Sequence, residues 1–267
     1  MEQSWAIVTG GGSGLGLAIA KRLAGQGYDI VIVGRNEQKL SDAAAVIQAC
    51  FERGAQCGTR PHVLTFPIDL SEDGAPEKLY EWAANEGVHP DVLVNNAGMY
   101  IYDKVLDVNS ARQKKLIGVN VNALASLCRL FGADMARQKE HSPAKGKYIL
   151  NIASYSVYMA IEGFGFYAGS KAFVRIFSKC FAKEMRHAGV KVTAVAPAGM
   201  DTTLMGLRPG IQRLARATGF LVSPDRIARI SLRAMKTGCV SYWIPGWYNI
   251  LFIPFLWMFQ PIFKKVL

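Results

Sequence analysis

The sequence has few cysteines and histidines, and neither residue type is clustered. Its five cysteines are scattered, and no two of them form a CxxC pair. This pattern excludes the disulfide framework of a small secreted domain and favours reduced thiols of an intracellular protein. The four histidines stand far apart and form no metal-ligand pattern, so we expect no metal site.

Acidic residues are also scarce, especially near the C-terminus. The chain has 31 Lys and Arg against 20 Asp and Glu, a net charge of +11, and Asp225 is the only acid after Thr202. The basic residues of that region are Arg208, Arg213, Arg216, Arg226, Arg229, Arg233, Lys236, Lys264 and Lys265. Such an excess indicates an anionic partner (a lipid headgroup, a membrane surface or an acidic substrate) or simply a solvated basic face. The sequence contains no nucleic-acid-binding module, so we expect no nucleic-acid partner.

No secretion signal precedes the first expected strand. Met1–Ser4 lacks a basic run, and the apolar run Trp5–Thr9 follows immediately. We therefore expect a cytoplasmic protein.

Short β-branched runs alternate with amphipathic stretches along the chain. The expected strands are Trp5–Thr9, Asp29–Val33, His62–Ile68, Asp91–Val94, Lys147–Ile152, Lys191–Ala196 and Val240–Ile244. The expected helices are Leu17–Gln26, Asn36–Arg53, Pro76–Glu86, Ala111–Lys139, Tyr167–Ala188 and Pro224–Lys236, the last capped by Ser223. This order predicts an α/β fold: a single doubly wound, Rossmann-type parallel sheet of about seven strands flanked by helices. We expect one domain over residues 1–244 and a hydrophobic extension over 245–267.

A glycine-rich turn, Gly10–Gly16, connects the first strand to the first helix. Glycines let the backbone approach a bound group closely, and a helix N-terminus offers free N–H groups and a positive dipole end. The context of strand, turn and helix favours a dinucleotide pyrophosphate over a purely structural turn.

The end of the second strand indicates which dinucleotide binds. An acid there would favour NAD by binding the adenosine ribose, but Gly34 occupies this place and Arg35 follows it. A guanidinium can pair with the 2′-phosphate of NADP, so we predict NADP (NADPH) as cofactor.

A tyrosine and a lysine are spaced for proton transfer. Tyr167 and Lys171 stand at i and i+4, which places them on one helix face. An ammonium near a phenol stabilises the phenolate, so we expect Lys171 to lower the pKa of Tyr167. Ser154 follows the fifth strand, at the sheet edge where ligands bind in such folds.

Together the Thr9-Gly10-x-x-x-Gly14-x-Gly16 turn, Asn95-Asn96-Ala97-Gly98, Ser154 and the Tyr167–Lys171 pair resemble the short-chain dehydrogenase/reductase family over about Trp5–Ile244. The resemblance implies an oxidoreductase with a catalytic tetrad of Asn120, Ser154, Tyr167 and Lys171. Tyr167 would be the acid/base, Ser154 would polarise the substrate oxygen, Lys171 would also bind the nicotinamide ribose, and Asn120 would support a water.

The resemblance also implies a set of cofactor contacts and a homo-oligomer. Besides Tyr167 and Lys171, these contacts are Thr9, Gly10, Gly12, Ser13, Gly14, Leu15, Gly16, Arg35, Asn36, Asp69, Leu70, Asn96, Ala97, Gly98, Pro197, Gly199 and Thr202. The chain departs from the family's usual Pro-Gly pair with Pro197-Ala198-Gly199, which puts the backbone path of that loop in question.

Nearby residues offer alternative assignments. Ser156 could replace Ser154, and Asn122 could replace Asn120. Tyr155 and Tyr158 are expected either to line the substrate pocket or to pack ordinarily.

The C-terminal region indicates the substrate class. Residues 202–221 alternate apolar and basic side chains, as a lid or as an amphipathic helix packed on the domain. Trp243–Phe263 carries no charge but contains three prolines, which favours an interfacial membrane segment over a spanning helix. A subunit interface or a pocket cover are the alternatives.

These features predict a lipophilic ketone as substrate, resembling the 3-ketoacyl, steroid or 3-ketosphinganine lipids reduced by some family members. The alternatives are a family member acting on a polar small molecule and a non-enzymatic NADP-binding sensor or scaffold.

Overall fold

A computed structural model of the 267-residue chain describes residues 4–52, 61–141, 146–158, 161–197, 222–238 and 240–244. Within these ranges all strands join one sheet. They are β1 (Trp5–Thr9), β2 (Asp29–Gly34), β3 (Val63–Pro67), β4 (Pro90–Asn95), β5 (Lys147–Ile152), β6 (Val190–Pro197) and β7 (Ser241–Ile244). Every pair is parallel, and the strand order is β3-β2-β1-β4-β5-β6-β7. The predicted doubly wound sheet of seven strands is therefore confirmed.

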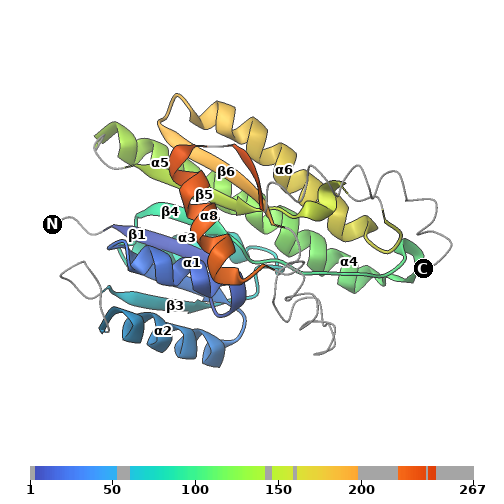
Figure 1. The fold of residues 1–267 in the computed structure, drawn as a ribbon, viewed down its shortest axis with the longest axis horizontal. Helices are drawn as coiled ribbons and strands as arrows, with labels where there is room; N and C mark the ends of the chain where they lie inside the picture. Colours follow the sequence, from blue (N-terminus) through green and yellow to red (C-terminus); the bar gives the residue numbers. More distant parts are fainter. Residues whose placement is uncertain are drawn as a thin grey trace.

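Helices cover both faces of this sheet (Figure 1). They are α1 (Gly14–Ala24), α2 (Glu37–Glu52), α3 (Ala75–Asn85), α4 (Ser110–Ile117), α5 (Leu124–His141), α6 (Gly165–Met185) and α8 (Pro224–Thr237). Short 3₁₀ turns span Val105–Asp107 (η1) and Tyr155–Tyr158 (η3), and a π-helical segment, η2, spans Gly118–Ala123.

Two apolar cores form, one on each side of the sheet. Side chains of α1, α2 and α8, such as Ile19, Leu40 and Leu232, pack on one face. Side chains of α3, α5 and α6, such as Leu79 and Phe131, pack on the other. The central strands β1 and β4 are buried on both sides, which explains why they read as continuous apolar runs rather than alternating ones.

The predicted helix over Ala111–Lys139 is one continuous stretch in space but changes its winding in the middle. Between α4 and α5, the six residues of η2 adopt π-helical geometry. A side chain at Gly118 would meet the carbonyl oxygen of Ser71 at 2.8 Å, so the close approach of another segment fixes glycine there. By length and composition alone, Ser110–Gln138 could cross a membrane, but its apolar face supplies Leu127 and Phe131 to a core.

The parallel arrangement positions the candidate site. Thr9, Gly34, Asn95, Ile152 and Pro197 are the last residues of β1, β2, β4, β5 and β6, so all five lie at the same edge of the sheet. The loops that follow these residues carry most of the polar groups singled out in the sequence. Residues 245–267, the expected extension, lie outside the described ranges.

Candidate active site

The glycine turn after β1 is packed too tightly for side chains at several positions. A Cβ at Gly16 would stand 2.2 Å from the carbonyl oxygen of Gly10, and one at Gly11 would stand 2.6 Å from Ile32. Gly10 and Gly14 also have positive φ angles of 65° and 53°. Geometry and sterics together therefore require glycine at these positions, and they leave the backbone bare.

The glycine turn leads into α1, whose N-terminus has no side-chain cap. The side chain of Ser13, at the N-cap position, makes no capping hydrogen bond, and the first turn of α1 has no acidic residue. The first backbone N–H groups of the helix are therefore available to an anion. This bare cradle of glycines fits the pyrophosphate of a dinucleotide.

Thr9 and Asn96 hold the turn against the end of β4. The Thr9 hydroxyl donates to the carbonyl oxygen of Val94 at 3.2 Å and accepts from the backbone N–H groups of Asn96 and Ala97, both at 3.0 Å. The Asn96 amide returns bonds to the carbonyl oxygens of Thr9 and Gly10 at 3.0 and 3.2 Å. In the structure both side chains thus shape the cofactor cradle by positioning its backbone.

Arg35 and Asp69 face each other at the ends of β2 and β3. The guanidinium of Arg35 lies 3.9 Å from the Asp69 carboxylate and keeps 73% of its side chain exposed, so it remains free to bind another anion. Burial alone would raise the pKa of Asp69, but hydrogen bonds from Ser71 and the nearby Arg35 and Lys115 lower it. Asp69 is thus an anchored carboxylate beside the predicted adenosine end of the cofactor site.

The side chains of two predicted cofactor contacts, Asn36 and Leu70, stabilise the fold. The side-chain oxygen of Asn36 accepts a hydrogen bond from the backbone N–H of Lys39 at 2.8 Å, as a cap for α2. The Leu70 side chain is buried in the core under α3. Only the backbone of Leu70 remains for a ligand.

Ser154 and Tyr167 meet beyond the end of β5. Ser154 follows the strand and accepts a hydrogen bond from the backbone N–H of Ser156 at 3.1 Å, which fixes its hydroxyl. Tyr167 lies in the first turn of α6, where hydrogen bonding with the nearby Ser154 lowers the pKa of its phenol. The structure therefore pairs Tyr167 with Ser154, and Ser156, the alternative, serves as a backbone donor to it.

The expected pKa shift of Tyr167 is wrong in direction. Burial raises the pKa of the phenol above its ordinary value of 10.0, and the Ser154 hydrogen bond, which lowers it, offsets only part of that effect. The expectation gave the Lys171 ammonium the main role, whereas Lys171 donates to the carbonyl oxygen of Ile152 at 2.9 Å. Tyr167 consequently keeps its proton at neutral pH.

Lys171 is itself buried beneath the cofactor side of the site. Only 5% of the residue is exposed, and burial lowers its pKa from 10.5 to about 8. A Cβ at Gly98 would lie 3.4 Å from the Lys171 ammonium nitrogen and 3.2 Å from the Asn120 amide oxygen. The glycine of the Asn-Ala-Gly turn thus leaves room directly in front of both polar groups.

Asn120 lies in the π-helical segment and is 1% exposed. Its amide oxygen accepts from the N–H of Met99 at 2.8 Å, and its nitrogen donates to the carbonyl oxygen of Met99 and the hydroxyl of Ser170, both at 3.0 Å. Ser170 in turn donates to the carbonyl oxygen of Tyr167 at 2.7 Å. The sequence reasoning missed Ser170, because no recognisable motif connects it with Asn120 along the sequence.

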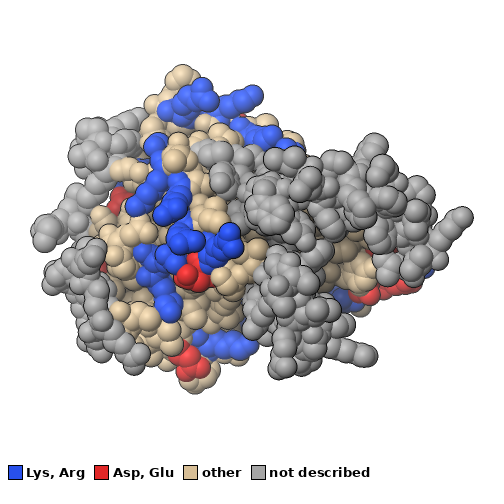
Figure 2. Space-filling view, viewed as in Figure 1, with Lys and Arg blue, Asp and Glu red and all other residues tan. Residues whose placement is uncertain are grey.

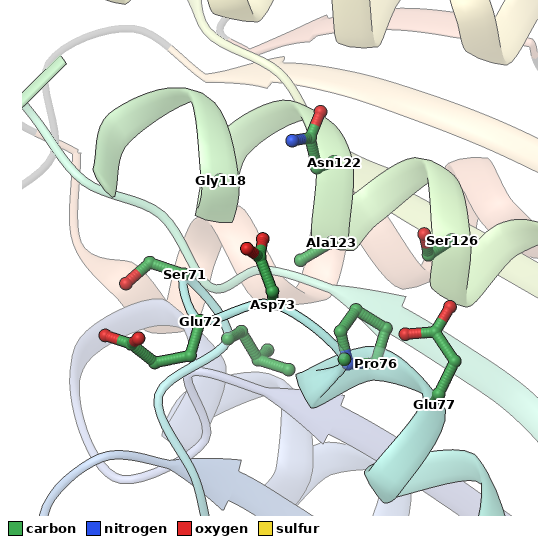
Figure 3. A pocket seen from close by; sticks show the side chains of 11 residues that line it. Ser71, Glu72, Asp73, Pro76, Glu77, Gly118, Asn122, Ala123 and Ser126 are labelled. Atoms are coloured by element: carbon green, nitrogen blue, oxygen red, sulfur yellow. The ribbon is translucent and has the colours of Figure 1, made fainter. Parts of the chain in front are cut away.

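Asn122, the alternative to Asn120, lies at a different place. It lines a hollow of about 320 Å³ between α3 and η2, together with Ser71, Glu72 and Asp73 (Figure 3). Figure 3 shows Asp73 pointing toward the helix segment that carries Gly118 and Ala123. This placement separates Asn122 from the group formed by Asn120, Ser170 and Tyr167.

Aromatic rings pack around Tyr167. Tyr100 packs edge-on against Tyr167 with ring centroids 4.9 Å apart, and Phe164 lies between Tyr100 and Tyr102 at 6.0 and 5.1 Å. The sequence reasoning missed Tyr100 and Tyr102, although they stand two and four residues after Gly98 of the Asn-Ala-Gly turn. Tyr155 and Tyr158 also pack edge-on, 5.7 Å apart, next to Ser154.

Some predicted site residues lie outside the described ranges. Pro197 ends β6 opposite Ile244, but Gly199, Thr202 and the expected lid over 202–221 are not among the described residues.

Comparisons with known proteins agree with this architecture. A family model described as short chain dehydrogenase matches residues 4–209. The very-long-chain 3-oxoacyl-CoA reductase of Rattus norvegicus is 32% identical over 250 residues, which cover 92% of this chain and 74% of that protein. A solved structure of a short chain dehydrogenase/reductase family protein superimposes with a TM-score of 0.73 at 27% identity, covering 91% of this chain and 96% of the other.

A further relative is considerably longer. The Probable oxidoreductase EphD of Mycobacterium tuberculosis is 33% identical over 198 residues, or 74% of this chain. The matched region spans only 31% of that protein. The family match, the sheet order and the geometry around Tyr167 converge on one conclusion: this chain belongs to the short-chain dehydrogenase family of oxidoreductases.

Proposed function

We propose that the protein is an NADPH-dependent reductase of a lipophilic ketone, such as a long-chain 3-keto lipid. One observation carries the proposal: the phenol of Tyr167, whose pKa is raised by desolvation and partly lowered again by Ser154, packs edge-on against the ring of Tyr100. A reductase needs a proton donor at the substrate oxygen, and a phenol that carries its proton at neutral pH can supply it.

The residues of the site divide the work between binding and proton transfer. The glycine cradle and the N-terminus of α1 would hold the pyrophosphate, and Lys171 would hold the nicotinamide ribose. When bound, the cofactor supplies the hydride. Ser154 would orient the substrate oxygen, and Tyr167 would donate its proton to that oxygen as negative charge develops there.

The preference for NADPH rests on Arg35. Members of the family bind a nicotinamide cofactor, and the exposed Arg35 directly follows β2, at the place where an acid would favour NAD. The distance of 3.9 Å between Arg35 and Asp69 is too long for a strong ion pair. The Arg35 guanidinium could therefore reorient to bind a phosphate.

The lipophilic substrate class rests on the rings and apolar side chains beside Tyr167. Tyr167 and Phe166 pack on a small apolar cluster of Ile101, Val108 and Leu116. That buried cluster supports the rings from behind, and the rings of Tyr100, Phe164 and Tyr102 lie beside Tyr167. An alkyl chain would gain from burial against these ring faces, whereas the hydroxyl groups of a sugar would find few partners on them. The rat very-long-chain 3-oxoacyl-CoA reductase, by its name, acts on such a substrate.

The test is NADPH oxidation by the purified protein with ketones of increasing chain length. We expect kcat/KM to rise with chain length, and Tyr167→Phe to lower kcat by roughly 10²–10⁴-fold with NADPH affinity nearly unchanged. Tyr100→Phe is the matched control, because it removes a neighbouring hydroxyl and keeps the ring. NADPH binding without turnover on any ketone would instead support a non-enzymatic sensor, and turnover confined to short polar ketones would reject the lipid substrate.

A further inference from the structure

Helix α8 presents a continuous stripe of cations to the outside of the molecule. Arg226, Arg229, Arg233 and Lys236 are all exposed, and their spacing places them on one face of the helix. The opposite face is buried in the core through residues such as Ile227 and Leu232. The stripe is therefore fixed in orientation by the packing of α8 on the sheet.

Helix α1 lies beside α8 and extends this charge. It contributes Lys21 and Arg22 and contains no acidic residue. The only acid on the two helices, Asp225, receives two hydrogen bonds from Arg22 at 2.9 and 2.6 Å. Because Asp225 is paired with Arg22, the other five basic side chains on these two helices have no acidic partner there. Figure 2 shows the resulting band of basic side chains over α1 and α8.

The form of this surface distinguishes between anionic partners. The cations are spread along two neighbouring helices and do not converge on a pocket, so the surface fits an extended array of charges better than a single phosphate. Among the described residues, the exposed large apolar side chains lie on other elements, so no aromatic ring on α1 or α8 is available to stack on a nucleobase. This pattern matches a bilayer with anionic headgroups.

The sequence that follows α8 supplies a second membrane signal. After β7 the chain continues through Pro245–Phe263, which is uncharged and rich in Trp and Phe, and then reaches Lys264 and Lys265. Stable peripheral attachment commonly needs two weak signals together, such as an apolar segment and a polybasic patch. Here both lie within one stretch of the chain, from α8 to the C-terminus.

We propose that the exposed face of α8 and α1, defined by Lys21, Arg22, Arg226, Arg229, Arg233 and Lys236, docks on an anionic phospholipid membrane. Each basic residue near such a surface strengthens binding by roughly fivefold, so the five uncompensated ones suffice to hold the protein at low affinity without the tail. The proposal concerns attachment only and does not depend on the identity of the ketone.

The test is vesicle co-sedimentation of the full-length protein without ketone or cofactor. One set of vesicles is phosphatidylcholine, and the other is phosphatidylcholine enriched in phosphatidylserine. We expect stronger binding to the anionic vesicles and a loss of that preference at high salt. Arg229→Glu/Arg233→Glu should weaken binding to the anionic vesicles by at least about tenfold, because two attractions become repulsions.

The matched control is Lys183→Glu/Arg186→Glu, which makes the same change in net charge at the C-terminal end of α6, on the opposite side of the sheet. This control should bind like the wild type, and both variants should keep their NADPH affinity, which reports an intact fold. Equal losses in the two variants would overturn the proposal, since only net charge would matter. Equal binding of wild type and Arg229→Glu/Arg233→Glu, or a preference for duplex DNA over anionic vesicles, would also overturn it.

Discussion

The amide nitrogen of Asn120 donates a hydrogen bond to the hydroxyl of Ser170 at 3.0 Å, and so links the π-helical segment to the helix that carries Tyr167 and Lys171. Both residues are buried, with exposed fractions of 1% and 3%. Because Ser170 passes the link on to the carbonyl oxygen of Tyr167, it acts as a positioning residue for the proton donor.

Removal of the Ser170 hydroxyl should therefore change turnover more than binding. We expect Ser170→Ala to lower kcat about tenfold with little change in KM for NADPH, because a lost buried hydrogen bond costs about 1–2 kcal/mol. Ser170→Thr, which keeps the hydroxyl, should restore most of the activity. Steady-state kinetics of the three proteins measure this split.

A second serine of the same helix provides the control. Ser178 donates to the carbonyl oxygen of Val174 at 2.7 Å and accepts from Asn151 at 2.9 Å, in the same arrangement as Ser170. Ser178→Ala should lower the free energy of unfolding by a similar amount but leave kcat unchanged. Equal losses of kcat in the two alanine variants would show that Ser170 acts only through stability.

The buried Lys171 sets an expected pH limit. Since its pKa is lowered to about 8, the ammonium loses its proton as the pH rises through that value, while Tyr167, whose pKa is raised, stays protonated. We expect kcat/KM for reduction to be highest below pH 8 and to fall above it. In Lys171→Arg, whose side chain stays charged, the falling limb should move to higher pH. A profile that is flat up to pH 10 would contradict this assignment.

Arg35 should decide between the two nicotinamide cofactors. Loss of a hydrogen-bonded charge pair with the 2′-phosphate costs about 1.5–3 kcal/mol, so Arg35→Ala should reduce the preference for NADPH over NADH by roughly ten- to a hundredfold. The ratio of kcat/KM for the two cofactors measures this change. Arg129→Ala removes another exposed arginine, on α5, and should leave the ratio unchanged. An unaltered ratio in Arg35→Ala would place the phosphate elsewhere.

Away from the site, Lys147 and Asp91 form a buried ion pair. We expect this pair to contribute to stability and not to activity. Their charged atoms are 2.6 Å apart, and their side chains are only 4% and 5% exposed. Asp91→Ala leaves the Lys147 ammonium buried without its carboxylate, so we expect a loss of 3–5 kcal/mol, on the order typical of broken buried pairs. Denaturant unfolding measures this loss. Asp91→Ala/Lys147→Met should recover much of it, and failure to recover would mean that Asp91 acts through other partners.

The sequence predicted the sheet and its helices because apolar periodicity and glycine turns are local signals. Ser223 was predicted as the cap of α8, and its hydroxyl accepts from the N–H of Arg226 at 3.3 Å. The break at Gly118–Ala123 was missed, because no proline marks it and the Ser71 backbone that packs against Gly118 comes from a distant segment.

The site shows the same division between local and tertiary information. The spacing of Tyr167 and Lys171 was readable, but the burial that raises the pKa of Tyr167 depends on side chains from other elements. Tyr100 illustrates this, since its ring reaches Tyr167 from the loop after β4. The direction of a pKa shift therefore requires the fold, even where the residues that titrate are evident from the motif.

The π-helical segment also sets the rotational phase of the helices on either side of it. Before it, Leu116 of α4 packs with Ile101 and Val108 near the aromatic surround, and after it, Leu127 and Phe131 of α5 face the sheet. Each residue of a helix turns the chain by about 100°, so loss of one residue here would rotate α5 against α4 by that angle. Such a deletion would turn Asn120 away from Ser170 and Leu127 out of the core at once. Substitutions in this stretch can be absorbed, but a change in its length would uncouple the site from the sheet.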